Sequence, residues 1–149
     1  MRARDYFEQI RSEVIGIERA RDMLARMRER EGAQTQRITE THGGSGDGDP
    51  SLAIIQRIDF ERRLERRIDS ASQSLDDASS VLYGSDGRGG LAKLKGTRYA
   101  DAICMAYLQA MPWAEIADIM QGSTRWCHTL CDVGFAYIDS AGWAKVKNA

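Results

Sequence analysis

The fold is decided by residues 112–139, PWAEIADIMQGSTRWCHTLCDVGFAYID, which have the pattern of a short helix, a tight turn and a longer helix. The run QGS at 121–123 interrupts the apolar periodicity of both helices. Ser123 or Thr124 can cap the second helix, because their hydroxyl oxygens accept hydrogen bonds from free backbone N–H groups. We therefore expect one helix at about 113–120 and another at about 124–139.

Two helices joined by so short a turn must cross closely, and their apolar residues fit this requirement. Ile116 is branched and Ala117 is small, so the second helix can approach the first at Ala117. Met120, Cys127 and Leu130 are expected to fill the wedge between the two helices. The residues left on the outer side of the second helix are candidates for DNA contact. They are Ser123, Thr124, Arg125, Trp126, His128 and Thr129.

The chemistry of these outward residues matches a double-stranded DNA partner. Hydroxyl groups and the N–H groups at a helix start bind phosphate oxygens, which positions a protein on the duplex. Arg125 suits a guanine edge or a phosphate, and His128 and Thr129 are placed to reach bases further along. The pattern predicts a helix-turn-helix whose second helix reads DNA.

The composition of the whole chain indicates an all-α protein. Of 149 residues only two are proline and 7% are aromatic, whereas 29% are charged. Two glycine-rich runs, HGGSGDGDP at 42–50 and GSDGRGG at 84–90, divide the chain into three helical blocks, because glycine disfavours helix interiors. We predict a long antiparallel helical hairpin in residues 1–83 with its loop at 42–50. A linker at 84–90 and a small helix-turn-helix domain in residues 91–149 follow.

The two long helices carry apolar residues at alternating spacings of three and four, as in a coiled coil. Ile17, Ala20 and Leu24 follow this spacing in the first helix, seven residues after Ile10. Leu75, Ala78 and Leu82 follow it in the second helix. Each apolar stripe needs a partner, so the helices are expected to fold back on each other. A two-helix hairpin still leaves apolar surface open, which either the C-terminal block or a second copy can cover. The long and narrow apolar stripe favours a homodimer.

Charge and cysteine content narrow the environment of the protein. The formal net charge is -1, so no overall positive field attracts the chain to nucleic acid. A single weakly charged domain should bind DNA weakly, which again favours a dimer. Three cysteines are too few for a disulfide framework and predict a reducing cytoplasm. No apolar run approaches the length of a membrane span, so no membrane partner is expected.

The run YLQAMPWAEIADIM at 107–120 resembles region four of bacterial sigma factors, where a helix ending in an aromatic–leucine pair precedes a Glu-Ile-Ala helix. Most of the chain also resembles small phage and prophage proteins of Gram-positive bacteria. The shared features are YFEQIR at 6–11, GSGD at 44–47 and a second long helix at 51–83. The resemblance implies a transcription regulator that binds DNA, with RNA polymerase as a further candidate partner. The turn differs, because the sigma pattern reads Leu-Gly-(Ile or Val)-Ser and this chain has MQGS at 120–123.

A metal site or a catalytic site agrees less well with the sequence than a DNA-binding surface does. Cys127, His128 and Cys131 suggest zinc, but His128 points about 100° away from Cys127 around a helix, and no paired CxxC is present. Buried apolar cysteines are therefore preferred. Asp47 and Asp49 lack the rest of a calcium loop, so a flexible loop is preferred there. No nucleophile–base pair is recognisable, so we expect a non-enzymatic protein without metal or cofactor.

Two alternatives to DNA reading remain open at this stage. The helix-turn-helix pattern also suits a module that only packs or contacts other proteins. The coiled-coil-like hairpin also suits a phage assembly or adaptor protein, in which the hairpin carries the function.

Overall fold

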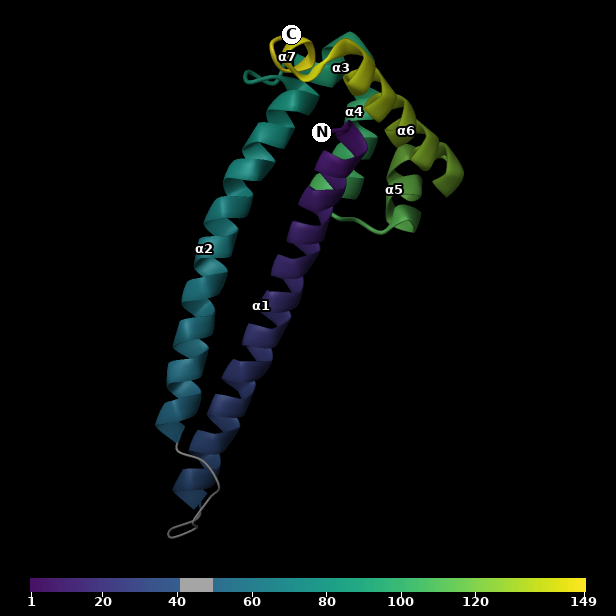
Figure 1. Ribbon diagram of the computed structural model, residues 1–149. Helices are drawn as coiled ribbons and strands as arrows, with labels where there is room; N and C mark the ends of the chain where they lie inside the picture. The colour runs from purple at the N-terminus through teal and green to yellow at the C-terminus, as the bar shows by residue number, and fades with distance from the viewer. Residues whose placement is uncertain (41–49) are drawn as a thin grey trace. The chain divides into compact units, whose positions relative to one another are not determined.

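A computed structural model describes the backbone of residues 1–40 and 50–149 and the side chains of residues 1–33 and 51–149 (Figure 1). All regular elements in these residues are helical, which confirms the predicted all-α fold. No helix among them is long and apolar enough to cross a membrane. The elements are α1 (Ala3–Glu40), α2 (Pro50–Tyr83), α3 (Gly90–Leu94), α4 (Thr97–Ile103), the π-helix η1 (Cys104–Leu108), α5 (Trp113–Met120), α6 (Thr124–Ala141) and α7 (Trp143–Lys147).

The chain divides into two compact units, and the divisions fall inside the two long helices. Unit 1 comprises Met1–Ile15 and Ala71–Ala149, and unit 2 comprises Gly16–Ser70. The sequence pattern placed the division at 84–90 instead. The difference arises because the start of α1 and the end of α2 carry buried side chains, among them Phe7 and Leu82, that belong to the core of the C-terminal helices.

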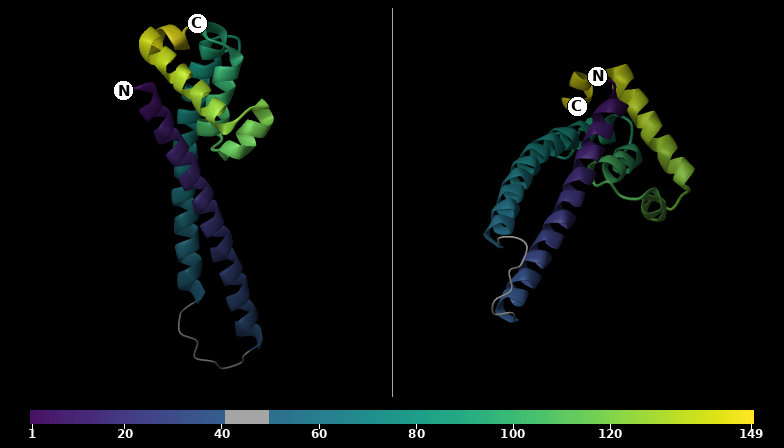
Figure 2. Two further views of the ribbon diagram at one scale, coloured as in Figure 1. Left: turned by 90° about the vertical axis from the view of Figure 1, so that its right-hand side faces the viewer. Right: turned by 60° about the horizontal axis from the view of Figure 1, so that its bottom comes forward.

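Unit 2 is an antiparallel helical pair, and its charged contacts show the direction of the two helices. Arg28 of α1 pairs with Glu61 of α2 at 2.6 Å, while Arg57, one turn earlier in α2, pairs with Glu31, further along α1. The two views of Figure 2 show the same opposed course of the two helices. The predicted loop at 42–50 lies outside the described residues apart from Pro50, which begins α2.

Unit 1 is built around aromatic side chains brought together from distant parts of the chain. Phe7 is fully buried and its ring stacks on Phe135 of α6 with a centroid distance of 5.5 Å. The rings of Tyr6, Tyr107 and Trp143 also lie within 6.5 Å of the Phe7 ring. This core packs the start of α1 against η1, α6 and α7, and so supports the helices that form the candidate site.

The glycine run at 84–90, expected as a linker, is a tightly packed turn. Gly89 and Gly90 are buried, and the N–H of Gly89 donates to the carbonyl of Tyr83 at 2.8 Å. Gly90 has a φ of +65°, and a Cβ there would lie 2.7 Å from backbone atoms of Leu82 and Tyr83. Glycine is required here because the backbone turns back directly over the end of α2.

The helix expected from Thr97 to Ala110 changes character partway along. It begins as α4 and continues as the π-helical turn η1, in which the N–H of Gln109 donates to the carbonyl of Cys104 at 3.0 Å. The Arg11 guanidinium donates to the carbonyl of Ala106 in this turn at 2.9 Å. Ala110 then takes a left-handed φ of 52° and directs the chain toward α5. The Arg11 hydrogen bond therefore ties the start of α1 to this widened turn, from which the chain continues into α5.

Candidate nucleic-acid interface

Helix α5 has the predicted bounds, and helix α6 begins at the predicted residue, Thr124, and ends at Ala141. A turn of three residues joins Met120 to Thr124. Gln121 ends α5 in the left-handed conformation, with a φ of 56°. The Ser123 hydroxyl oxygen accepts a hydrogen bond from the backbone N–H of Trp126 at 3.0 Å. Ser123 is thus the N-cap of α6, and its hydroxyl is used for capping.

The wedge between the two helices is filled as the apolar spacing predicted. Ile116 and Ala117 are buried on α5, and Cys127 and Leu130 are buried on α6. Met120 is half-buried at the end of α5 and packs against the same core. Because the wedge is closed by these side chains, the opposite side of α6 is left toward solvent at its beginning.

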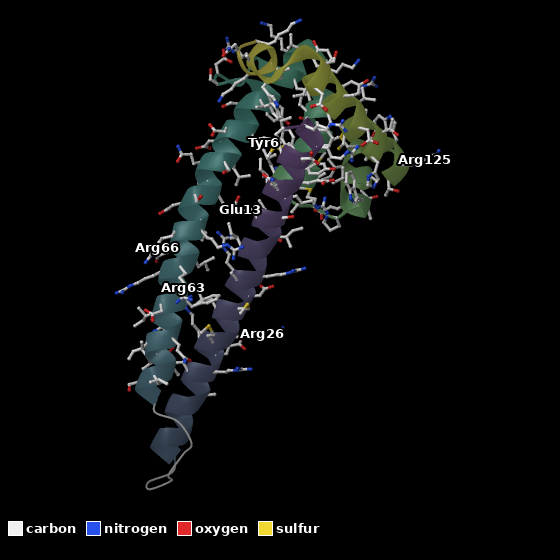
Figure 3. The ribbon with its side chains drawn as sticks, viewed as in Figure 1. Tyr6, Glu13, Arg26, Arg63, Arg66 and Arg125 are labelled. Atoms are coloured by element: carbon white, nitrogen blue, oxygen red, sulfur yellow. The ribbon has the colours of Figure 1, made fainter. Side chains whose placement is uncertain are left out.

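The outer edge of α6 is exposed over its first two turns. Ser123, Thr124, Arg125, His128 and Thr129 are exposed, and Trp126 is half-buried. Figure 3 shows Arg125 pointing away from the rest of unit 1. Among the described side chains Arg125 has no salt bridge, so its guanidinium is available to an external acceptor. The Thr129 hydroxyl donates to the carbonyl of Arg125 at 3.0 Å.

Trp126 has a packing role that explains the unusual turn. A Cβ on Gly122 would lie 2.3 Å from the Trp126 ring, so the ring covers Gly122 directly. The sigma-like pattern places a branched apolar residue at this position of the turn. A side chain at this position would collide with the indole ring, so only glycine leaves room for it. Trp126 therefore lies back on the turn, while its five companions are exposed.

His128 is held by a ring contact with α5. Its imidazole stacks on the Trp113 indole with a centroid distance of 3.7 Å and an interplanar angle of 27°. The Arg11 guanidinium also lies 5.7 Å from the Trp113 ring centroid. This stack fixes the orientation of an exposed imidazole at the second turn of α6.

The later turns of α6 are occupied by the beginning of α1. The backbone N–H of Ala3 donates to the Asp139 carboxylate at 2.8 Å, and Arg4 forms a salt bridge with Asp132. The hydrogen bond that the Arg4 guanidinium donates to the Asp132 carboxylate raises the pKa of Arg4. The free part of α6 is therefore its N-terminal two turns, the part of a recognition helix that contacts base edges.

The charges around this edge favour DNA only weakly. Arg125 is the single basic residue of α6, whereas Glu115 and Asp118 are exposed on α5. Phosphate neutralisation supplies most of the sequence-independent affinity for DNA. One arginine beside two carboxylates supplies little of it, so this edge alone would bind duplex DNA weakly.

The cysteines do not form a metal site in the described part of the chain. Cys127 and Cys131 are buried and Cys104 is half-buried, and no group of three or more potential ligand side chains is found among the described residues. Burial raises the pKa of the Cys131 thiol to about 12. A protonated, buried thiol acts as an apolar side chain, as the sequence analysis preferred.

The chain has no match among known protein families, curated proteins or solved structures.

Proposed function

We propose that the chain is a non-enzymatic, sequence-specific DNA-binding regulator of the phage or prophage type, with α6 as its base-reading helix. The observation that carries the proposal is the exposed N-terminal edge of α6, with Arg125 unpaired among the described side chains. The resemblance of residues 107–120 to sigma region four supports it. RNA polymerase is a further candidate partner on that resemblance alone.

The individual side chains have roles that follow from their placement. Arg125 lies in the first turn of α6 and projects into solvent, where a guanidinium can donate two hydrogen bonds to a guanine edge. Thr124 and the free N–H groups at the helix start suit a phosphate. His128, oriented by Trp113, is presented one turn further along.

We infer that the regulator acts as a homodimer assembled through unit 2. Among the described side chains of unit 2, the buried apolar residues are Ile17, Ala20 and Leu64, whereas Met23 and Leu52 are 54% and 58% exposed. So small a core leaves apolar surface that a second copy would cover. Two copies would also present two reading helices, which helix-turn-helix proteins use on paired half-sites.

The test compares two single arginine substitutions that remove the same charge. Duplexes bound by the full-length protein are first selected from a random-sequence pool, and the affinity for the best duplex is then measured by fluorescence anisotropy. Arg125→Ala is expected to lower that affinity about tenfold to a hundredfold and to relax base preference at one position. Arg66→Ala removes an exposed arginine of α2 and is expected to change neither the affinity nor the base preference.

Two results would overturn the assignment of α6 as the reading helix. One is an equal loss of affinity in both variants, and the other is no loss in either. A solution mass of two chains is expected from sedimentation. A large ring or filament that selects no duplex would instead favour the assembly or adaptor function of the hairpin.

A further inference from the structure

The lysines of this chain are concentrated at one end of unit 1. No lysine occurs before residue 93, and the four in the chain are Lys93 and Lys95, in and just after α3, and Lys145 and Lys147 in α7. Helices α3 and α7 pack against each other, and Figure 1 shows them side by side. Lysines about 50 positions apart in the sequence therefore come together at one end of unit 1.

Two arginines and two aromatic rings extend this group. Arg88 lies in the turn before α3, and Arg98 lies in the first turn of α4. The Lys95 ammonium is 5.5 Å from the ring centroid of Tyr99 and 6.0 Å from that of Tyr137 on α6. The Arg98 guanidinium is 5.1 Å from the Tyr99 ring centroid. We call this surface the lysine face; it consists of Arg88, Lys93, Lys95, Arg98, Lys145 and Lys147.

The charges of the lysine face are not neutralised within unit 1. All six side chains are exposed, and none forms a salt bridge among the described residues. Residues 87–100 and 140–149 contain no acidic residue. Of the acidic residues nearest in sequence, Asp101 accepts from the Tyr83 hydroxyl at 2.7 Å and Asp139 accepts from the N–H of Ala3. Asp86 is exposed and accepts from the backbone N–H of Arg88 at 3.0 Å.

We propose that the lysine face binds the phosphodiester backbone of duplex DNA without regard to sequence, as a second contact separate from the Arg125 edge. That the partner of the lysine face is duplex DNA rests on the proposed function. Six exposed cations without a salt bridge among the described residues would provide the phosphate neutralisation that the first turns of α6 lack. Tyr137, whose ring lies beside Lys95, follows Arg125 by twelve residues on α6, which is about 18 Å along the helix axis.

An anionic membrane fits this surface less well than a nucleic acid. Membrane-surface binding needs apolar side chains that enter the lipid as well as positive charge. Among the described residues of α3, α4 and α7 there is no large exposed apolar side chain. Val146 is buried, and the Trp143 ring packs against Tyr6.

The experiment removes the four lysines and compares the result with an equal loss of charge in unit 2. Lys93, Lys95, Lys145 and Lys147 are replaced together by Gln in the full-length protein. The control replaces four exposed arginines of unit 2 by Gln: Arg19, Arg26, Arg62 and Arg66. Binding to a duplex of arbitrary sequence is measured by anisotropy over a series of salt concentrations, with thermal melting to verify that both variants fold.

The slope of log affinity against log salt is expected to fall by about 3 to 4 in the lysine variant, since each neutralised phosphate contributes about 0.9. The control is expected to keep the slope of the unmodified protein. Equal slopes in all three proteins would overturn the proposal, as would an equal decrease in both variants. Lysine-dependent binding to phosphatidylserine vesicles without binding to the duplex would also overturn it.

Arg125→Ala separates this inference from the function on which it rests. That variant is expected to lose preference for the selected duplex and to keep most of the salt dependence on the arbitrary one. The lysine variant is expected to keep the preference for the selected duplex and to lose most of the salt dependence on the arbitrary one. If Arg125→Ala has no effect and the lysine variant still loses its slope, the reading role of α6 fails while the lysine face stands.

Discussion

Unit 1 packs four aromatic side chains around Phe7, whereas unit 2 joins its two helices through arginine–glutamate pairs and a few buried apolar residues. Burial of large apolar side chains contributes far more to stability than ion pairs in contact with water. The unit that carries both proposed DNA contacts therefore holds its geometry by its own core. The hairpin unit depends on weaker contacts, consistent with a proposed role in pairing with a second copy.

The distribution of tryptophan makes this comparison measurable. Trp113, Trp126 and Trp143 all belong to unit 1. Tryptophan fluorescence therefore reports the unfolding of unit 1, while far-UV circular dichroism reports the loss of helix in both units. Denaturation followed by both signals distinguishes a change in one unit from a change in the whole chain.

The largest effect is expected from removing the central ring of unit 1. Phe7→Ala should lower the free energy of unfolding of unit 1 by about 3–5 kcal/mol, because it removes a buried ring and leaves a cavity among four others. The measurement is the denaturant midpoint of tryptophan fluorescence.

The matched change in unit 2 is Leu64→Ala. Leu64 is only 5% exposed, so the substitution should lower the free energy of unfolding of unit 2 by about 2–3 kcal/mol. Circular dichroism should show this change more clearly than tryptophan fluorescence. If both substitutions shift the two signals by equal amounts, the units unfold together and the contrast between them does not describe separate stabilities.

Two helix glycines offer a sharper contrast, because the same substitution is expected to act in opposite directions. A Cβ on Gly134 of α6 would lie 2.7 Å from Ile103 and 3.3 Å from Leu91, both fully buried. Gly134→Ala should therefore destabilise unit 1 by about 1–3 kcal/mol through overpacking. The midpoint of tryptophan fluorescence measures this loss.

In unit 2 the group above Gly16 is the free end of the flexible Arg67 side chain, 2.4 Å from an added Cβ. The guanidinium can swing away, so Gly16→Ala should stabilise unit 2 by up to about 1 kcal/mol through helix propensity. A destabilising Gly16→Ala, seen by circular dichroism, would mean that Arg67 is held in place and that unit 2 is packed more tightly than its small core suggests.

The sequence predicted the parts of this structure that depend on local spacing. The break at 121–123, the wedge of Ile116 and Ala117 and the exposure of Arg125 follow from helical periodicity over a few residues. The reading role of the six outward residues stays a prediction, because exposure is a condition for it and not a demonstration.

Features that depend on contacts between distant segments were not predictable from the same pattern. The run at 84–90 has a linker composition, yet Gly90 packs on the end of α2. The π-helical turn after Ile103 depends on hydrogen bonds that the apolar stripe does not show. In the sequence the lysines contribute only to a net charge of +1 over residues 91–149, six basic against five acidic residues. Their two halves meet only when α3 and α7 pack together.

The smallest expected effect concerns acid and is confined to unit 2. Hydrogen bonds from Arg28 and Arg57 lower the pKa of Glu61 below its ordinary value of 4.5. A lowered folded-state pKa stabilises the fold fully above the ordinary value, and this contribution disappears as the pH falls through the folded-state pKa. The circular dichroism melting temperature should therefore decline on acidification, and Glu61→Gln should remove part of that decline. Glu65→Gln, at an exposed carboxylate without a salt bridge among the described residues, is the matched control. An equal effect of both substitutions would show that general charge, rather than the Arg28–Glu61–Arg57 contacts, governs how unit 2 responds to acid.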